Sequence, residues 1–199
     1  MNIEGAPTPI RVFAAIRPSE ATLNPLSEWW DTAHVLLPKT DWRPIPIENW
    51  HVTLAFYGEL DPKDLPGLQR QLDEIAGETP CFGIETRGFG AFPSAVRPRV
   101  FWVGTFAIDP PKALAELAYR CLYATDEKVR VNPKKSPQTF RGHISLARSK
   151  GRRTVDLAPF GRQPPPMIRE QVGAICLYRS ELTPKGARYR LIERFPLKN

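Results

Sequence analysis

Twenty-two prolines are distributed along the whole length of this 199-residue chain. Proline lacks a backbone N–H and its ring clashes with the preceding helical turn, so this distribution excludes a coiled coil or a bundle of long helices. The apolar fraction of 42% is ordinary for a globular protein and too high for a disordered one. We therefore expect a compact, loop-rich α/β or α+β protein, either one domain or two small lobes sharing a core.

Several classes of protein are excluded by local features of the sequence. No apolar run approaches the ~18–20 residues that a membrane-spanning helix needs, and residues 1–5 lack the basic and apolar regions of a signal peptide. Cys81, Cys121 and Cys176 have neither the number nor the spacing of a disulfide framework or a zinc site. We expect reduced cysteines in a cytoplasmic protein. The net charge of +7 favours an anionic partner such as nucleic acid.

Apolar spacing predicts three helices and about seven strands. The first helix begins at Ser19, or only at Pro25, and ends near Leu37. The second covers about residues 61–76, and the third follows residues 109–111. The expected strands are residues 11–16, 50–57, 81–89, 99–105, 142–147, 167–178 and 188–195, with a turn at 162–166. No shift in composition divides the chain, so we expect a single domain over residues 1–199, built from two closely packed α+β lobes.

The most informative feature is a repeated motif. Residues 51–55 read His-Val-Thr-Leu-Ala, and residues 143–147 read His-Ile-Ser-Leu-Ala, 92 positions further along. The chain has only three histidines, and two of them share this pattern. The third, His34, stands alone on the first predicted helix, where we expect a structural or solvent-exposed side chain.

Strand geometry explains how the repeat can carry chemistry. Residues i and i+2 of a strand point to the same face. Alternation divides the two motifs into a core-facing set, Val52, Leu54, Phe56, Ile144 and Leu146, and a groove-facing set, His51, Thr53, Ala55, His143 and Ser145. Core packing alone gives no reason to repeat His-x-hydroxyl. We therefore expect two imidazoles and two hydroxyls to face one small anion across a groove.

This set of groups suits the cleavage of a phosphodiester. The reaction removes a proton from the attacking oxygen and delivers one to the leaving oxygen, and histidine can hold either protonation state near neutral pH. Hydroxyls can hydrogen-bond the non-bridging phosphate oxygens. No metal is needed if both protons are handled by the histidines, and the sequence contains no acidic cluster with metal-ligand spacing. We expect neither a metal nor a cofactor.

At these residues the sequence resembles the two-histidine phosphoesterase superfamily, and within it the RNA 2′,3′-cyclic phosphodiesterase family, also called 2′–5′ RNA ligase or LigT-like. The likeness covers nearly the whole chain. The blocks that carry it are residues 11–16, 42–59, 88–102 (which include Gly-Phe-Gly-Ala-Phe-Pro), 140–148 and 177–186.

The resemblance implies a bilobal α+β fold with pseudo-twofold symmetry, two antiparallel sheets forming a central groove, and helices on the outside. It also implies metal-independent hydrolysis of RNA 2′,3′-cyclic phosphates to 2′-phosphomonoesters, and the reversible 2′–5′ joining of tRNA halves. By this analogy His51 donates a proton to the leaving 3′ oxygen and His143 accepts one from water, while Thr53 and Ser145 hold the phosphate. The residues alone do not decide which histidine has which role, because the motifs are nearly symmetric.

Further site residues follow from the resemblance. Arg148 occupies a position associated with phosphate binding, although strict alternation would put it opposite His143, so a bulge or strand end is needed to turn it inward. Phe56 and Tyr57 are candidates to line a nucleobase site. Gly142 stands where the family usually has proline. A basic cluster that could follow an RNA backbone brackets the second motif: Lys134, Lys135, Arg141, Lys150, Arg152 and Arg153.

Two alternative functions remain open at this stage. The protein could be a non-catalytic RNA-binding protein whose groove holds phosphate. It could also hydrolyse small cyclic nucleotides, such as ADP-ribose cyclic phosphate, rather than RNA ends. We expect a monomer with no membrane association.

Overall fold

The computed structural model describes residues 8–39, 41–124, 139–150, 154–184 and 186–199. The fold is α+β, as predicted, with antiparallel strands and few helices. The strands are β1 (Ile10–Ile16), β2 (Trp42–Pro44), β3 (Val52–Leu60), β4 (Phe82–Phe92), β5 (Val100–Asp109), β6 (His143–Ser149), β7 (Arg169–Val172), β8 (Ala174–Thr183) and β9 (Gly186–Pro196). The helices are α1 (Glu20–Ala33), α2 (Leu65–Glu78), α3 (Ala113–Leu122) and α4 (Ala158–Arg162), with 3-10 turns at His34–Leu36, Ile47–Asn49 and Pro62–Asp64.

In the described ranges the strands form one sheet in the order β7-β4-β5-β6-β3-β1-β8-β9, and β2 pairs with the far end of β6. The two motif strands, β3 and β6, are neighbours at the centre of this order, joined through the single pair Val52–Ile144. The two expected sheets are therefore two halves of one sheet, because this pair connects them. The order outward from β3 is β1, β8, β9, and outward from β6 it is β5, β4, β7, which suits duplicated lobes. The duplication itself remains a prediction.

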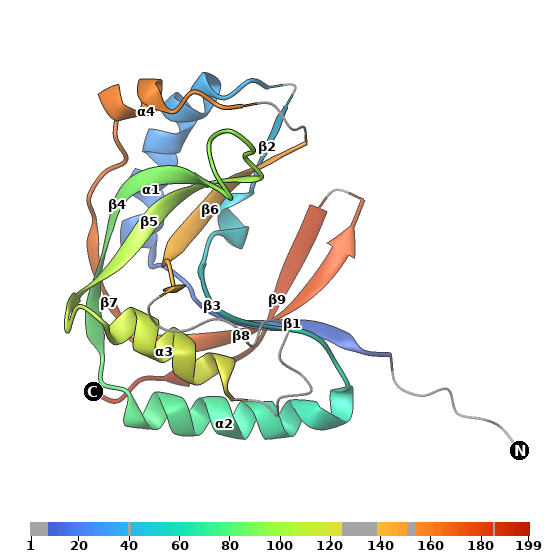
Figure 1. Ribbon diagram of the computed structural model, residues 1–199. Coiled ribbons are helices and arrows are strands. Elements are labelled where there is room, and N and C mark those ends of the chain that lie inside the picture. The colour runs from blue at the N-terminus through green and yellow to red at the C-terminus, as the bar shows by residue number, and fades with distance from the viewer. Residues whose placement is uncertain (1–7, 40, 125–138, 151–153, 185) are drawn as a thin grey trace, which may run out of the picture.

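The helices lie on the outside of this curled sheet, as Figure 1 shows. Helix α1 lies behind the half that contains β4, β5 and β6, and α2 runs along the outer side of β8 and β9. The predicted apolar face of α2 is buried at Leu68, Leu72 and Ile75. Helix packing thus covers one face of the sheet and leaves the other face available for a groove.

Several local expectations were wrong. Helix α1 begins at Glu20, directly after Ser19, and continues through Pro25, so the first of the two predicted starts is confirmed and the second is wrong. The long strand expected at 167–178 is divided into β7 and β8 at Gly173. Strand β3 does not end at Gly58; this glycine adopts a φ of 72°, which side chains disfavour, and the strand continues to Leu60. The short elements β2 and α4 were not predicted, because three to five residues carry too little periodicity.

Candidate active site

The first motif contains an irregularity that alternation does not predict. Across the β1–β3 pair, Ala15 lies opposite Thr53 and Ala14 lies opposite Ala55, so Leu54 is an extra residue in β3. Such a bulge reverses the facing of the residues that follow it, here as far as the next register shift, between Val12 and Phe13. Ala55 accordingly lies on the core side, 3% exposed, where we expected it on the groove side.

The second motif carries the same irregularity at the equivalent position. Across the β5–β6 pair, Trp102 lies opposite Ser145 and Phe101 lies opposite Ala147, so Leu146 is an extra residue in β6. The two motifs therefore match in backbone conformation as well as in sequence. In each motif the imidazole and the hydroxyl precede the bulge and lie on the groove side. The side chain that directly follows the bulge lies on the opposite face from the one that alternation predicts.

The bulges decide which of the later candidates reach the groove. Arg148 follows the bulge in β6, so it returns to the face of His143 and is exposed. The bulge in β6 therefore turns Arg148 toward the groove, as the sequence analysis required for a residue that contacts the phosphate. Alternation placed Phe56 in the core, whereas the resemblance made it a candidate to line a nucleobase site. It lies on the groove side, is half-buried and lines the same cavity as His143. Tyr57 lies on the opposite side of the strand: it is buried, and its hydroxyl donates to the carbonyl oxygen of Cys121 at 2.9 Å. The prediction that Tyr57 lines a nucleobase site is therefore wrong.

The His51 imidazole is held at both of its nitrogens. Nδ1 lies 2.7 Å from the carbonyl oxygen of Asn49, and Nε2 lies 3.0 Å from Thr53 Oγ1. A carbonyl can only accept, so Nδ1 carries the proton and donates. In the neutral ring Nε2 then accepts from the Thr53 hydroxyl. The residue pair that the sequence placed side by side is in direct contact.

The electrostatic surroundings of His51 favour its neutral form. Burial lowers its pKa from the ordinary 6.5 to about 4, because the charged ring would lose its hydration. The hydrogen bond to Asn49 works in the opposite direction, while positive charge on His143, Arg148 and Arg17 lowers the pKa further. This effect of His143 and Arg148 on His51 shows that the two motifs share one electrostatic environment.

His143 is oriented in the same way in a more open setting. Its Nδ1 lies 2.8 Å from the carbonyl oxygen of Arg141, again two residues before the histidine. The ring meets the edge of Phe92 with centroids 4.9 Å apart, and Trp102 lies 6.2 Å away. Both histidines thus use Nδ1 to hold a backbone carbonyl, and His51 also contacts Thr53 through Nε2.

Residues distant in sequence hold the first histidine in place. Arg17 Nη1 donates to the carbonyl oxygens of Ile47, Glu48 and Trp50 at 3.0, 3.0 and 2.7 Å, which holds the turn that carries Asn49. Around the His51 ring, Phe13 packs at 4.9 Å and Tyr189 meets it edge-on at 5.3 Å. These supporting residues come from the end of β1, from β1 itself and from β9. No local signal identified them.

A cavity of about 510 Å³ joins the two motif strands. Thr53 and Phe56 of β3 and His143 of β6 line it, together with Phe92 and Phe140. Of the basic cluster expected around the second motif, Arg141 lines this cavity, and Lys150 lies just past the end of β6. Its other members, Lys134, Lys135, Arg152 and Arg153, lie outside the described residues. The cavity thus combines the His143 imidazole with aromatic walls, and its volume suits a nucleoside.

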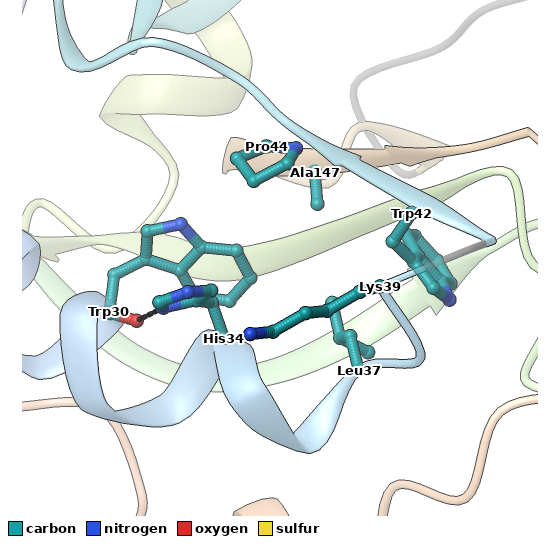
Figure 2. Close-up of a pocket in the computed structure, with 7 residues that line it drawn as sticks. All are labelled: Trp30, His34, Leu37, Lys39, Trp42, Pro44 and Ala147. Atoms are coloured by element: carbon teal, nitrogen blue, oxygen red, sulfur yellow. Dashed lines mark hydrogen bonds between the residues drawn. The ribbon is translucent and has the colours of Figure 1, made fainter.

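The third histidine lies elsewhere, as expected. His34 lines a separate pocket of about 230 Å³ with Trp30 and Trp42, and Ala147 closes one side of it (Figure 2). Its Nδ1 donates to the carbonyl oxygen of Trp30 at 3.0 Å, so the side chain is a structural one.

In the described part of the chain no group of three or more histidine, cysteine or acidic side chains could hold a metal ion. None of the helices in those ranges is long and apolar enough to span a bilayer.

Comparisons with known proteins indicate the family of this chain. A family model described as LigT-like phosphoesterase matches residues 16–102. The chain is 32% identical over 166 residues to the RNA 2′,3′-cyclic phosphodiesterase of Thermus thermophilus, covering 81% of this chain and 78% of that protein. It is 33% identical over 171 residues to the protein of the same name from Aeropyrum pernix, covering 80% and 87%.

Solved structures show the same fold. The crystal structure of the Thermus thermophilus protein TT0787 superposes with a TM-score of 0.77 at 28% identity, covering 95% of this chain and 98% of that one. The Escherichia coli LigT structure in complex with NADP⁺ superposes with a TM-score of 0.73 at 25% identity, covering 96% and 99%.

Proposed function

Because the chain belongs to the LigT-like phosphoesterase family, we propose that it hydrolyses the 2′,3′-cyclic phosphate of RNA ends to a 2′-phosphomonoester without a metal ion. The observation that carries the proposal is the matched pair of motifs. Each histidine is fixed through Nδ1 by a carbonyl two residues earlier, and each motif strand has its bulge at the same leucine. In this proposal both Nε2 atoms exchange protons with the reacting groups.

In the proposed reaction a water oxygen attacks the phosphorus and the bond from phosphorus to the 3′ oxygen breaks. His143 accepts the proton that the water loses, and His51 donates a proton to the leaving 3′ oxygen. Thr53 and Ser145 hydrogen-bond the non-bridging oxygens, and the Arg148 guanidinium stabilises the charge that develops on them. If the 5′ hydroxyl of a second RNA takes the place of water, the same groups form a 2′–5′ link.

The low pKa of His51 bears directly on this assignment. The free site holds His51 neutral at pH 7, yet a proton donor must be protonated. A bound phosphate places negative charge beside the ring, which favours the imidazolium form and raises the pKa. We therefore expect the substrate to bind together with a proton. Calorimetry of 2′-AMP binding in buffers of different ionisation enthalpy would detect this uptake, and binding without proton uptake would contradict the donor role of His51.

The decisive experiment is hydrolysis of adenosine 2′,3′-cyclic phosphate with the product resolved as 2′- or 3′-phosphate. We expect the 2′-phosphate alone, at a rate unchanged by EDTA. RNA binding without turnover would instead support a phosphate-binding protein, and loss of activity with EDTA would point to a metal site. Two further expectations, a monomeric state and a cytoplasmic location, belong to the proposal and can be tested by sedimentation and cell fractionation.

A further inference from the structure

A second cavity lies next to the candidate active site, on the side of β4 and β5. Its volume is about 430 Å³, and it shares Phe140 and Arg141 with the cavity that contains His143. Arg87, Trp102 and Phe106 line the rest of its open side. The two cavities are therefore adjacent, with Phe140 and Arg141 between them.

The sheet register places this cavity in line with the second histidine. His143 of β6 lies opposite Gly104 of β5, and Gly104 lies opposite Arg87 of β4. Partners across antiparallel strands point to the same face, so Arg87 and His143 share the groove face about 10 Å apart. The intervening residue is a glycine, because a Cβ there would come within 2.6 Å of the Arg87 carbonyl oxygen and 2.8 Å of the Phe106 ring.

Phe106 and Arg87 form a flat, exposed surface at the outer end of this row. The Arg87 guanidinium carbon lies 4.4 Å from the centroid of the Phe106 ring, and Phe106 is 42% exposed, unusual for an aromatic side chain on a strand. Arg87 is also held by Glu85 at 3.2 Å, which orients it over the ring. Aromatic rings and guanidinium planes are the surfaces on which unpaired RNA bases stack.

A positive charge suited to a sugar–phosphate backbone lies between the two cavities. Arg141 lines both of them and is exposed. It can therefore contact the phosphate that joins two nucleotides.

We infer that this cavity is a second nucleotide subsite, in which Phe106 and Arg87 stack a base and Arg141 contacts the connecting phosphate. The inference rests on the proposed function. A 2′,3′-cyclic phosphate ends an RNA chain, so the neighbouring nucleotide can only lie on its 5′ side. The subsite would make the enzyme prefer oligonucleotide ends over mononucleotides.

The test compares adenosine 2′,3′-cyclic phosphate with the dinucleotide ApA 2′,3′-cyclic phosphate. We expect wild-type kcat/KM to be higher for the dinucleotide, and Phe106→Ala to lower it about tenfold for the dinucleotide while changing it less than twofold for the mononucleotide. Ile108→Ala is the matched control: Ile108 is 37% exposed two residues further along β5, outside the cavity. Equal wild-type rates on both substrates, or equal losses in Phe106→Ala, would overturn the subsite.

A binding experiment separates failure of the subsite from failure of the proposed function. Fluorescence anisotropy with a 5′-labelled RNA tetranucleotide bearing a terminal 2′-phosphate requires no turnover. We expect Phe106→Ala to weaken this binding about tenfold. Arg141→Gln should reduce the slope of log Kd against log salt by about 0.7, the value for one phosphate contact to single-stranded nucleic acid. Unchanged affinity and salt slope would refute the subsite whether or not the protein is an enzyme.

Discussion

The two motif histidines have nearly the same local sequence and the same Nδ1 hydrogen bond, yet their surroundings differ. His51 is enclosed by Phe13 and Tyr189 and contacts Thr53 through Nε2. The Nδ1 hydrogen bond of His143 is exposed, and its ring meets the edge of Phe92 and lies 6.2 Å from Trp102. Burial lowers the pKa of His51 to about 4. A sequence repeat can therefore produce a chemically asymmetric pair, because burial depends on residues outside the repeat.

The largest expected effect is loss of either histidine. His51→Ala and His143→Ala should each lower kcat for a 2′,3′-cyclic phosphate by about 10³-fold, because each removes one proton-transfer step. His34→Ala is the matched control and should retain activity, since His34 lies in a separate pocket. Thermal unfolding would confirm that the variants remain folded. Near wild-type activity in either motif variant would break the proposed pairing of roles.

The hydroxyls should have smaller effects that differ between the motifs. Thr53→Val and Ser145→Ala should each lower kcat about 10²-fold, because each removes a donor to the phosphate. Only Thr53→Val should also raise the pKa of His51, since the Thr53 hydroxyl stabilises the neutral ring. An NMR titration of the histidines would detect the difference. Identical titrations in both variants would show that Thr53 does not distinguish the two sites.

The buried histidine should also make stability depend on pH. The pKa of His51 is lower in the folded state, about 4, than its unfolded value near 6.5, so the unfolded chain binds the extra proton between these values. This contribution is present above pH 6.5 and is lost as the pH falls toward 4. Wild type should lose about 2 kcal/mol more than His51→Gln between pH 7 and pH 5, about 30-fold in the unfolding equilibrium.

Urea unfolding at the two pH values measures this difference. His34→Gln serves as a control for removing a histidine outside the groove. If wild type and His51→Gln lose stability equally, His51 is not buried in the neutral form and the contrast with His143 disappears.

Arg148 should have the smallest of these effects. Arg148→Ala should raise KM about tenfold through the lost phosphate contact, and it should raise the pKa of His51, because a nearby positive charge is removed. Lys150→Ala removes an equal charge just past the end of β6 and should leave both quantities nearly unchanged. Similar effects of the two substitutions would indicate a general field of positive charge rather than a specific contact.

Much of the fold followed from local patterns. The apolar spacing of α2 and the strand character of the two motifs appear in the structure as predicted. The bulges at Leu54 and Leu146 did not, because an extra residue in a strand leaves no mark in local composition. This one omission explains why Phe56 and Tyr57 were assigned to the wrong faces.

By itself the sequence determined the α+β class, the two motifs and the pairing of each imidazole with a hydroxyl, since residues two apart on a strand share a face. Only the tertiary structure decided that Arg148 turns inward, that Arg17 and Asn49 hold His51, and that Arg87 lies in line with His143 across Gly104. These features depend on strand register and on burial. Both arise from contacts between segments far apart in the chain, about which local periodicity carries no information.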